Sequence, residues 1–173
     1  MNFEPHKGVG RAVIERMALF AGLISFQPWD RLVLVDMDGT LADCSHRLPL
    51  ISDGNHDWDG FERLALADAP RQSIIELVNI LWSWGYKILI VSGRQIDRAG
   101  ENTITWLRKY DIQFEHIFMR NGGDTRQDVI VKQEILDKLP KNQIHYVLDD
   151  RNQVVDMWRK NGLTCLQVAP GDF

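Results

Sequence analysis

Short apolar runs alternate with longer amphipathic stretches from residue 31 onward. Five runs predict strands, over residues 31–36, 86–92, 117–119, 144–148 and 163–168. Their nearly continuous hydrophobicity is typical of strands buried on both faces of a parallel sheet. Apolar residues at helical spacing predict four intervening helices, over residues 70–85, 97–110, 126–139 and 152–161. This order predicts right-handed crossovers and a three-layer α/β/α Rossmann-like parallel sheet.

A further amphipathic stretch precedes this alternation. Five apolar residues share one helical face there, namely Val9, Val13, Met17, Phe20 and Ile24. We interpret residues 9–26 as an extra N-terminal helix docked ahead of a single domain that spans residues 1–173. A helix that binds a partner protein is the alternative interpretation.

Polar residues follow three of the predicted strands at their carboxyl ends. Asp36, Asp38 and Thr40 follow the first strand. Ser92 and Arg94 end the second strand, and Asp149 and Asp150 end the fourth. In open α/β sheets the ligand binds outside the carboxyl ends of the strands. These side chains are therefore predicted to form one site.

Four of these residues are carboxylates. Like charges a few ångströms apart disfavour full ionisation unless a cation neutralises them. Mg²⁺ suits the set best, because it binds one or two carboxylates and completes its shell with water and phosphate oxygens. We therefore predict Mg²⁺ as the cofactor, with Asp36, Asp38, Asp149 and Asp150 as its candidate ligands. Turn and helix-cap roles are the alternative for each aspartate alone.

The pair Asp36 and Asp38 also predicts a reaction. Residues i and i+2 of an extended segment face the same way, so one carboxylate can act as nucleophile and the other as proton donor. Thr40 and Ser92 add hydroxyl donors, and Lys132 adds fixed positive charge. Phosphoryl transfer needs this combination, since its catalysis consists mostly of positioning and charge neutralisation.

Four segments in order resemble the motifs of the haloacid dehalogenase (HAD) superfamily of phosphohydrolases. They are Val33-Leu-Val-Asp-Met-Asp-Gly-Thr-Leu-Ala42, Val91-Ser-Gly-Arg94, Lys132 and Val147-Leu-Asp-Asp150. The resemblance implies a HAD-like fold and a phosphatase that forms an aspartyl-phosphate intermediate. Only residues 43–69 remain to form a lid, so the cap is expected to be small or absent.

The segments 123–132 and 149–173 are more specifically similar to the phosphatase domain of the bacteriophage polynucleotide kinase/3′-phosphatase family. The similarity implies that Asp36 is the nucleophile and Asp38 the general acid/base. It implies phosphate or substrate contacts for Thr40, Arg47, Ser92, Gly93, Arg94, Asp128 and Lys132. It also implies that Asp150 is a direct metal ligand, with Asp149 beside it.

The composition narrows the classes of partner. Lys and Arg total 20 against 24 Asp and Glu, a net charge of −4, which argues against a protein that coats nucleic-acid backbone. No apolar stretch is long enough to cross a membrane. Cys44 and Cys165 are too few for a disulfide framework, which fits a reducing compartment. We therefore expect a cytoplasmic enzyme, in the host cytoplasm if the chain is phage-encoded.

The phosphate-binding loop of ATP-using kinases is absent from the sequence, which contains no Gly-x-x-x-x-Gly-Lys-Ser/Thr. Kinase activity is therefore not expected. The predicted substrate is a phosphorylated nucleic-acid end, and the alternative is a free (deoxy)nucleoside 5′-monophosphate. His46, Trp58 and Phe61 are either packing residues or ligand contacts. A homo-oligomer could complete the open site.

A receiver-like module that stores phosphate as a signal is the non-enzyme alternative. Such modules also combine acids, a metal and a lysine in a parallel α/β fold. In receivers, however, the acid pair follows the first strand and the phosphorylated aspartate ends a later one. The order here is the reverse, which favours turnover.

Overall fold

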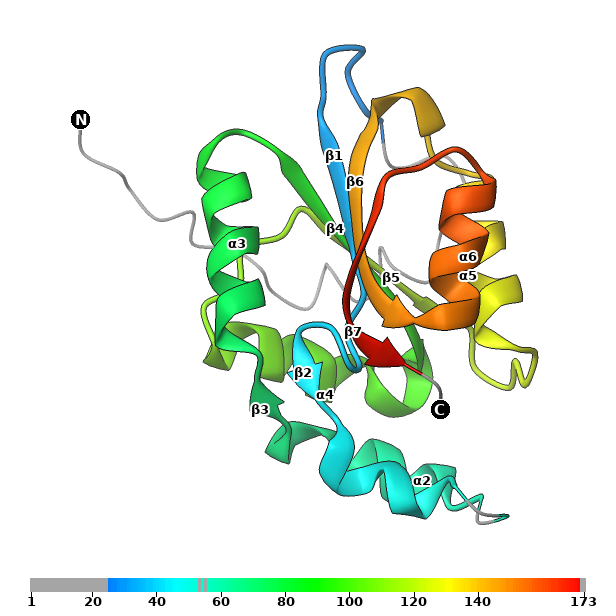
Figure 1. Ribbon diagram of the computed structural model, residues 1–173. Coiled ribbons are helices and arrows are strands. Elements are labelled where there is room, and N and C mark those ends of the chain that lie inside the picture. The colour runs from blue at the N-terminus through cyan, green and yellow to red at the C-terminus, as the bar shows by residue number, and fades with distance from the viewer. Residues whose placement is uncertain (1–24, 53, 55, 172–173) are drawn as a thin grey trace.

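The computed structural model describes residues 25–52, 54 and 56–171. A five-stranded parallel sheet forms its centre, with strand order β5-β4-β1-β6-β7 (Figure 1). The strands are β1 (Leu32–Val35), β4 (Lys87–Gln95), β5 (His116–Arg120), β6 (Ile144–Arg151) and β7 (Cys165–Gly171). The helix expected over residues 9–26 lies almost wholly outside the described residues. The parallel sheet itself confirms the predicted fold class.

Helices cover both faces of the sheet, which completes the three layers. On one side lie α3 (Gln72–Ser83) and α4 (Ile96–Lys109), and on the other α5 (Asp128–Leu136) and α6 (Asn152–Lys160) (Figure 1). A single turn of 3₁₀-helix, η3 (Lys141–Gln143), precedes β6. No helix in the described part of the chain is long and apolar enough to span a bilayer.

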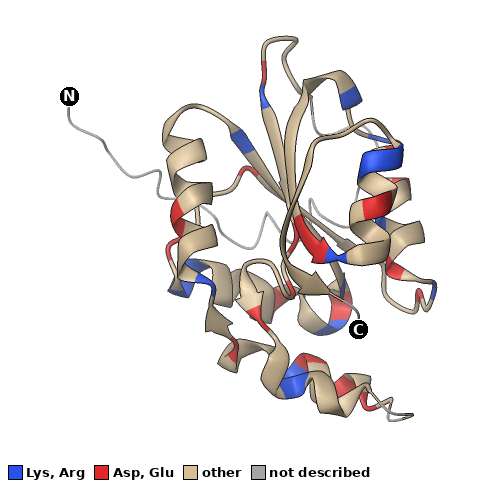
Figure 2. Cartoon of the chain, in the orientation of Figure 1, with Lys and Arg blue, Asp and Glu red and all other residues tan. Residues whose placement is uncertain are grey.

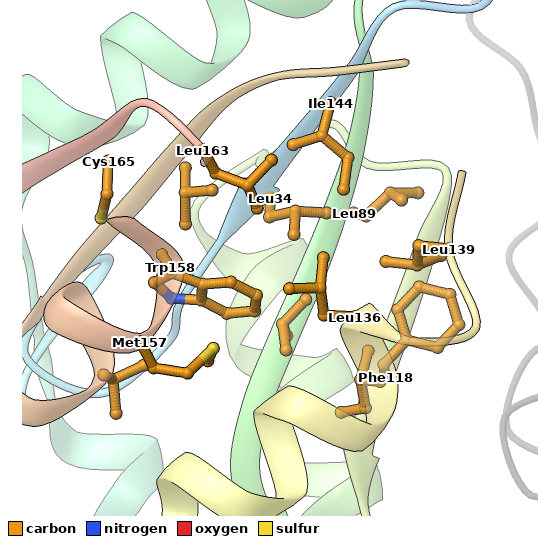
Figure 3. Close-up of a cluster of buried hydrophobic side chains, with 14 of the residues drawn as sticks. Leu34, Leu89, Phe118, Leu136, Leu139, Ile144, Met157, Trp158, Leu163 and Cys165 are labelled. Carbon is orange, nitrogen blue, oxygen red and sulfur yellow. The ribbon is translucent and has the colours of Figure 1, made fainter. Parts of the chain in front are cut away.

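The strand β1 shows why its sequence is apolar throughout. Leu32 and Leu34 belong to the core cluster under α5 and α6, whereas Val33 and Val35 belong to the cluster under α3 and α4. Alternate residues of a strand face opposite sides, so a strand in the middle layer needs apolar residues at every position. Figure 3 shows the first cluster, in which Leu34 and other aliphatic side chains surround Trp158.

Strands β4, β6 and β7 each extend three residues further at their carboxyl ends than the sequence predicted. β4 continues through Gln95 and β6 through Arg151, so the polar residues at their carboxyl ends lie inside the strands. Pairing is irregular there, with register shifts between Ser92 and Gln95 and between Asp149 and Arg151. Such irregularities are common next to active sites, where they redirect side chains. The helix predicted over 126–139 is shorter at both ends, because Gln127 is extended and the α-helix stops at Leu136.

Residues 42–70 form an insertion beside the carboxyl ends of the strands. It contains a two-stranded antiparallel ribbon of β2 (Ala42–Asp43) and β3 (Ala69–Pro70). Between these strands lie the short helices η1 (Ser45–Leu50), α2 (Trp58–Arg63) and η2 (Leu64–Ala67) (Figure 1). Arg98 on α4 contacts Asp59 on α2 at 2.8 Å, so the insertion also touches the core domain. The segment expected to form a small lid is therefore a compact helical insertion.

Candidate active site

Lys132 and Asp36 form the centre of the site. Asp36 follows β1, and Lys132 reaches it from α5 with its Nζ 2.6 Å from Asp36 Oδ1. The same Nζ lies 3.0 Å from Oδ2 of Asp149 on β6. All three side chains are buried. Ion pairs in such surroundings are screened little by solvent, so the lysine holds the two carboxylates firmly in place.

Asp36, Asp149 and Asp150 form the one group of described residues that could hold a metal ion. Each offers a carboxylate oxygen, and these oxygens lie within 4.8 Å of one another. Figure 2 shows the acidic positions at the carboxyl end of β6, next to a basic position. The sequence prediction of a carboxylate cluster at this edge thus agrees with the structure for three of its four members.

The hydrogen bonds distinguish the two aspartates of β6. Asp149 Oδ2 accepts from Lys132 Nζ and, at 3.1 Å, from Trp158 Nε1. Oδ2 of Asp150 is buried and has no hydrogen-bond partner. A buried carboxylate oxygen without a partner is costly, and a bound cation is one way to satisfy it. The donor set therefore fits Mg²⁺, which prefers carboxylate oxygens, and Asp36 and Asp150 are the residues that would hold it.

The pKa values of Asp36 and Asp150 lead to the same conclusion. Burial raises the pKa of Asp36 well above its usual range; Lys132 opposes the rise and Asp149 adds to it. Burial, followed by the charge of Asp149, raises the pKa of Asp150 to about 6. Two neighbouring acids with raised pKa values need additional positive charge to be fully ionised together at neutral pH.

Gly39 allows the chain to pass close to the triad. Its φ is +86°, and a Cβ at this position would lie 2.1 Å from Oδ2 of Asp150. Thr40 is fully buried, and its Oγ1 donates to the other oxygen of Asp150 at 3.3 Å. The segment after β1 thus both makes room for the Asp150 carboxylate and orients it.

Asp38 is not part of the acidic triad, although the sequence placed it with the other three carboxylates. Arg94 binds it through two nitrogens, at 2.9 Å to Oδ2 and 2.5 Å to Oδ1, and Arg47 Nη2 also donates to Oδ1. Burial raises the pKa of Asp38, but Arg94 and Arg47 outweigh it and hold the pKa below its usual range. The proton donor predicted from the sequence is therefore held by two arginines.

Asp68 is the residue of this site that sequence reasoning missed. It is fully buried and accepts from Arg47 Nε at 2.8 Å, from Arg47 Nη2 at 2.7 Å and from Arg94 Nη2 at 3.1 Å. His46 Nε2 lies 2.9 Å from the same carboxylate. Asp68 thus binds both of the arginines that bind Asp38. No motif marks it, and only its burial among two arginines identifies it.

The remaining predicted residues line or support the same region. Asp128 lies 3.3 Å from Lys132 and 3.4 Å from Arg120. A Cβ on Gly93 would come within 2.2 Å of Asp128, so glycine is needed for this close approach. Ser92 is buried, and its Oγ accepts from the backbone nitrogen of Arg94 at 3.2 Å.

A cavity of about 480 Å³ opens onto these groups. Its lining includes Asp36, Asp38, Arg94, Lys132 and Asp150. One wall comes from the insertion and the other from residues 123–127, before α5. Four of the predicted residues do not line the cavity and instead support the side chains that do, namely Thr40, Arg47, Ser92 and Asp149. The volume lies within the range of roughly 300–1,000 Å³ that is typical of small-molecule sites.

Comparison with known proteins identifies a family. The polynucleotide kinase PNKP phosphatase domain matches residues 30–173. A putative bifunctional polynucleotide kinase/RNA ligase from Autographa californica nuclear polyhedrosis virus is 32% identical over 133 residues, which are 75% of this chain and 18% of that protein. The chain thus spans under a fifth of this curated relative.

Solved structures agree with this relationship. The Pnkp1/Rnl/Hen1 RNA repair complex contains a chain that is 31% identical, with a TM-score of 0.71, over 87% of this chain and 46% of that one. A putative phosphatase from Clostridium difficile shares the fold at 19% identity and a TM-score of 0.56, over 82% of this chain and 86% of that one. With its Asp-x-Asp segment, buried lysine and paired aspartates at one sheet edge, the chain belongs to the polynucleotide kinase PNKP phosphatase domain family of HAD-type phosphatases.

Proposed function

We propose that the chain is a Mg²⁺-dependent phosphomonoesterase that removes 3′-phosphate from nucleic-acid ends through an aspartyl-phosphate on Asp36. The observation that carries the proposal is that the two acids of the Asp-x-Asp segment have different surroundings. Asp36 lies in the triad 2.6 Å from Lys132, and Asp38 lies apart between two arginines. One acid is thereby placed for attack with a cation, and the other for proton transfer.

The reaction proceeds in two displacements. An oxygen of Asp36 attacks phosphorus, and the bond to the leaving 3′-oxygen breaks as Asp38 donates its proton to that oxygen. Asp38 then removes a proton from water, the water oxygen bonds to phosphorus, and the bond to Asp36 breaks. Bound Mg²⁺ supplies positive charge that offsets the repulsion between a carboxylate nucleophile and a phosphate dianion.

The protonation of Asp38 is linked to substrate binding. Without substrate, Arg94 and Arg47 favour its carboxylate form. A phosphate dianion that enters next to Arg94 brings negative charge close to Asp38, and this charge raises the pKa of the carboxyl. The arginines therefore keep Asp38 ionised before the substrate arrives. Once the phosphate is bound, its negative charge allows Asp38 to hold a proton.

The family match and the open cavity support a nucleic-acid end as the substrate. A free deoxynucleoside 5′-monophosphate is the second candidate, because a cavity of about 480 Å³ is large enough for a single small ligand. The receiver-like alternative does not agree with membership of a phosphatase family.

A side-by-side assay tests the substrate. Purified protein with Mg²⁺ is given a 3′-phosphorylated oligonucleotide and, separately, each deoxynucleoside 5′-monophosphate. We expect a higher kcat/KM for the oligonucleotide. A tenfold or greater preference for the mononucleotides contradicts the proposal and supports the nucleotidase. The cytoplasmic location and the homo-oligomer remain predictions, and light scattering of the purified protein tests the latter.

A further inference from the structure

Trp58 stands at the edge of the catalytic cavity with much of its ring uncovered. It begins α2 in the insertion, lines the cavity that contains Asp36 and Asp38, and is 51% exposed. Its ring meets that of Phe61 edge-to-face at 5.9 Å. Phe61, by contrast, is only 7% exposed. The indole thus packs on Phe61, lines the same cavity as the catalytic acids and keeps about half of its surface uncovered.

The direction of the reaction places the substrate's leaving group on this side of the cavity. In-line attack by Asp36 sends the leaving oxygen to the opposite side of phosphorus, toward the acid that protonates it. That acid, Asp38, is bound by Arg47, and the Arg47 guanidinium lies 3.9 Å from the centre of the Phe61 ring. Trp58 packs on the same Phe61. The group attached to the leaving oxygen therefore extends toward α2.

The cavity lining from Arg120 and residues 123–127 offers no comparable surface. Its arginines already have carboxylate partners. Arg120 contacts Asp128 at 3.4 Å, and Arg126 contacts Asp124 at 2.8 Å and also binds Glu134. Trp58 is the one cavity-lining aromatic of the described chain that is exposed.

We propose that Trp58 stacks on the base of the terminal nucleotide whose 3′-phosphate is removed. The inference rests on the proposed function, because that function supplies the nucleoside as leaving group. Base–aromatic stacking does not depend on the identity of the base, since every base has a π-face. The subsite therefore accepts all four bases and distinguishes a nucleotide end from a phosphate ester without a base.

Two substrates and three variants test the subsite. One substrate is a short 3′-phosphorylated oligonucleotide, and the other carries an abasic tetrahydrofuran residue under the same 3′-phosphate. Both are assayed with Mg²⁺ against the wild type, Trp58→Ala, Trp58→Phe and Trp29→Ala. Trp29 is the matched control, because it is 75% exposed and does not line the cavity. Thermal melting confirms that each variant is folded.

We expect removal of the base to lower kcat/KM of the wild type by roughly 5- to 150-fold, the range that stacking on an aromatic supplies. On the normal oligonucleotide, Trp58→Ala should lower kcat/KM by the same factor. On the abasic substrate, its kcat/KM should equal that of the wild type. Trp58→Phe should recover much of the loss, and Trp29→Ala should match the wild type on both.

Two other outcomes are distinguishable. Equal losses by Trp58→Ala on the two substrates, or no loss on either, overturn the stacking inference and leave the proposed function intact. If the wild type hydrolyses nucleoside 5′-monophosphates but neither of the two 3′-phosphorylated substrates, both the proposed function and the inference are overturned.

Discussion

Lys132 and Asp36 are 96 residues apart in sequence, and their side chains meet at 2.6 Å inside the protein. The lysine also contacts Asp149 at 3.0 Å and Asp128 at 3.3 Å, so one ammonium group serves three carboxylates. Burial by itself would lower the pKa of Lys132, but the three acids outweigh it and raise the pKa well above its usual range. The active-site acids and this lysine therefore depend on one another.

Replacement of Lys132 by methionine should destabilise the fold. Removal of one partner of a buried ion pair costs about 3–5 kcal/mol, because the other charge stays buried and uncompensated. Urea unfolding measures this free energy. Lys141→Met is the control. Lys141 pairs with Asp137 at the surface, with the same spacing of four residues that separates Lys132 from Asp128. An exposed pair of this kind contributes at most about 1 kcal/mol. Similar losses in the two variants would contradict the role assigned to Lys132.

Gly39→Ala should remove the metal site. The new Cβ would lie 2.1 Å from Asp150 Oδ2, so the carboxylate has to move. We expect Mg²⁺ to raise the melting temperature of the wild type and to leave that of the variant unchanged, with activity lost as well.

Gly162→Ala is the control that distinguishes the contact of the new Cβ with Asp150 from the backbone strain of positive φ. Gly162 has a similar φ of +82°, but a Cβ there meets nothing within 4 Å. The strain of positive φ costs about 1–2 kcal/mol at either position. If Gly162→Ala also lost its response to Mg²⁺, the close approach of Gly39 to Asp150 would not be the reason.

Asp68→Asn should affect the proton-transfer step selectively. It weakens the support behind Arg47 and Arg94, which position Asp38. We expect kcat/KM on a 3′-phosphorylated oligonucleotide to fall by roughly 10²-fold, a typical contribution of general acid catalysis. On p-nitrophenyl phosphate, whose leaving group needs no proton, kcat/KM should change much less. Equal losses on the two substrates would indicate a merely structural role for Asp68.

The two cysteines should make stability fall at high pH. Burial raises the pKa of Cys44 and that of Cys165 from 9.0 to about 12. Between pH 9 and 12 the thiols therefore ionise in the unfolded chain but not in the folded one, so the free energy of unfolding decreases as pH rises. Urea unfolding across this range measures the slope. A double variant, Cys44→Ala with Cys165→Ala, should show a smaller slope, and an unchanged slope would contradict the burial argument.

Sequence patterns predicted most of the fold because burial dictates them directly. Leu32 to Val35 had to be apolar at every position to serve two cores, and this signal identifies a central parallel strand. The meeting of Asp36 with Asp149 and Asp150 followed from the rule that parallel strands end at one edge.

Side-chain direction could not be predicted in the same way. Asp38 was grouped with the metal ligands, yet its carboxylate is bound by Arg47 and Arg94. Asp68 was not singled out, because its contacts depend on how the insertion folds back over the core. The extension of β4 and β6 beyond their apolar residues was missed as well, since backbone pairing there continues past the hydrophobic pattern.

The central claim is that Asp36 becomes phosphorylated during turnover, and chemical trapping tests it most directly. In Asp38→Asn, p-nitrophenyl phosphate can still phosphorylate Asp36 because its leaving group needs no proton, but hydrolysis of the intermediate is slowed. Quenching with borohydride reduces an aspartyl-phosphate to homoserine, which peptide mass spectrometry locates. We predict homoserine at position 36, and no turnover by Asp36→Asn. Continued turnover by Asp36→Asn, with no modification at position 36, would contradict the account.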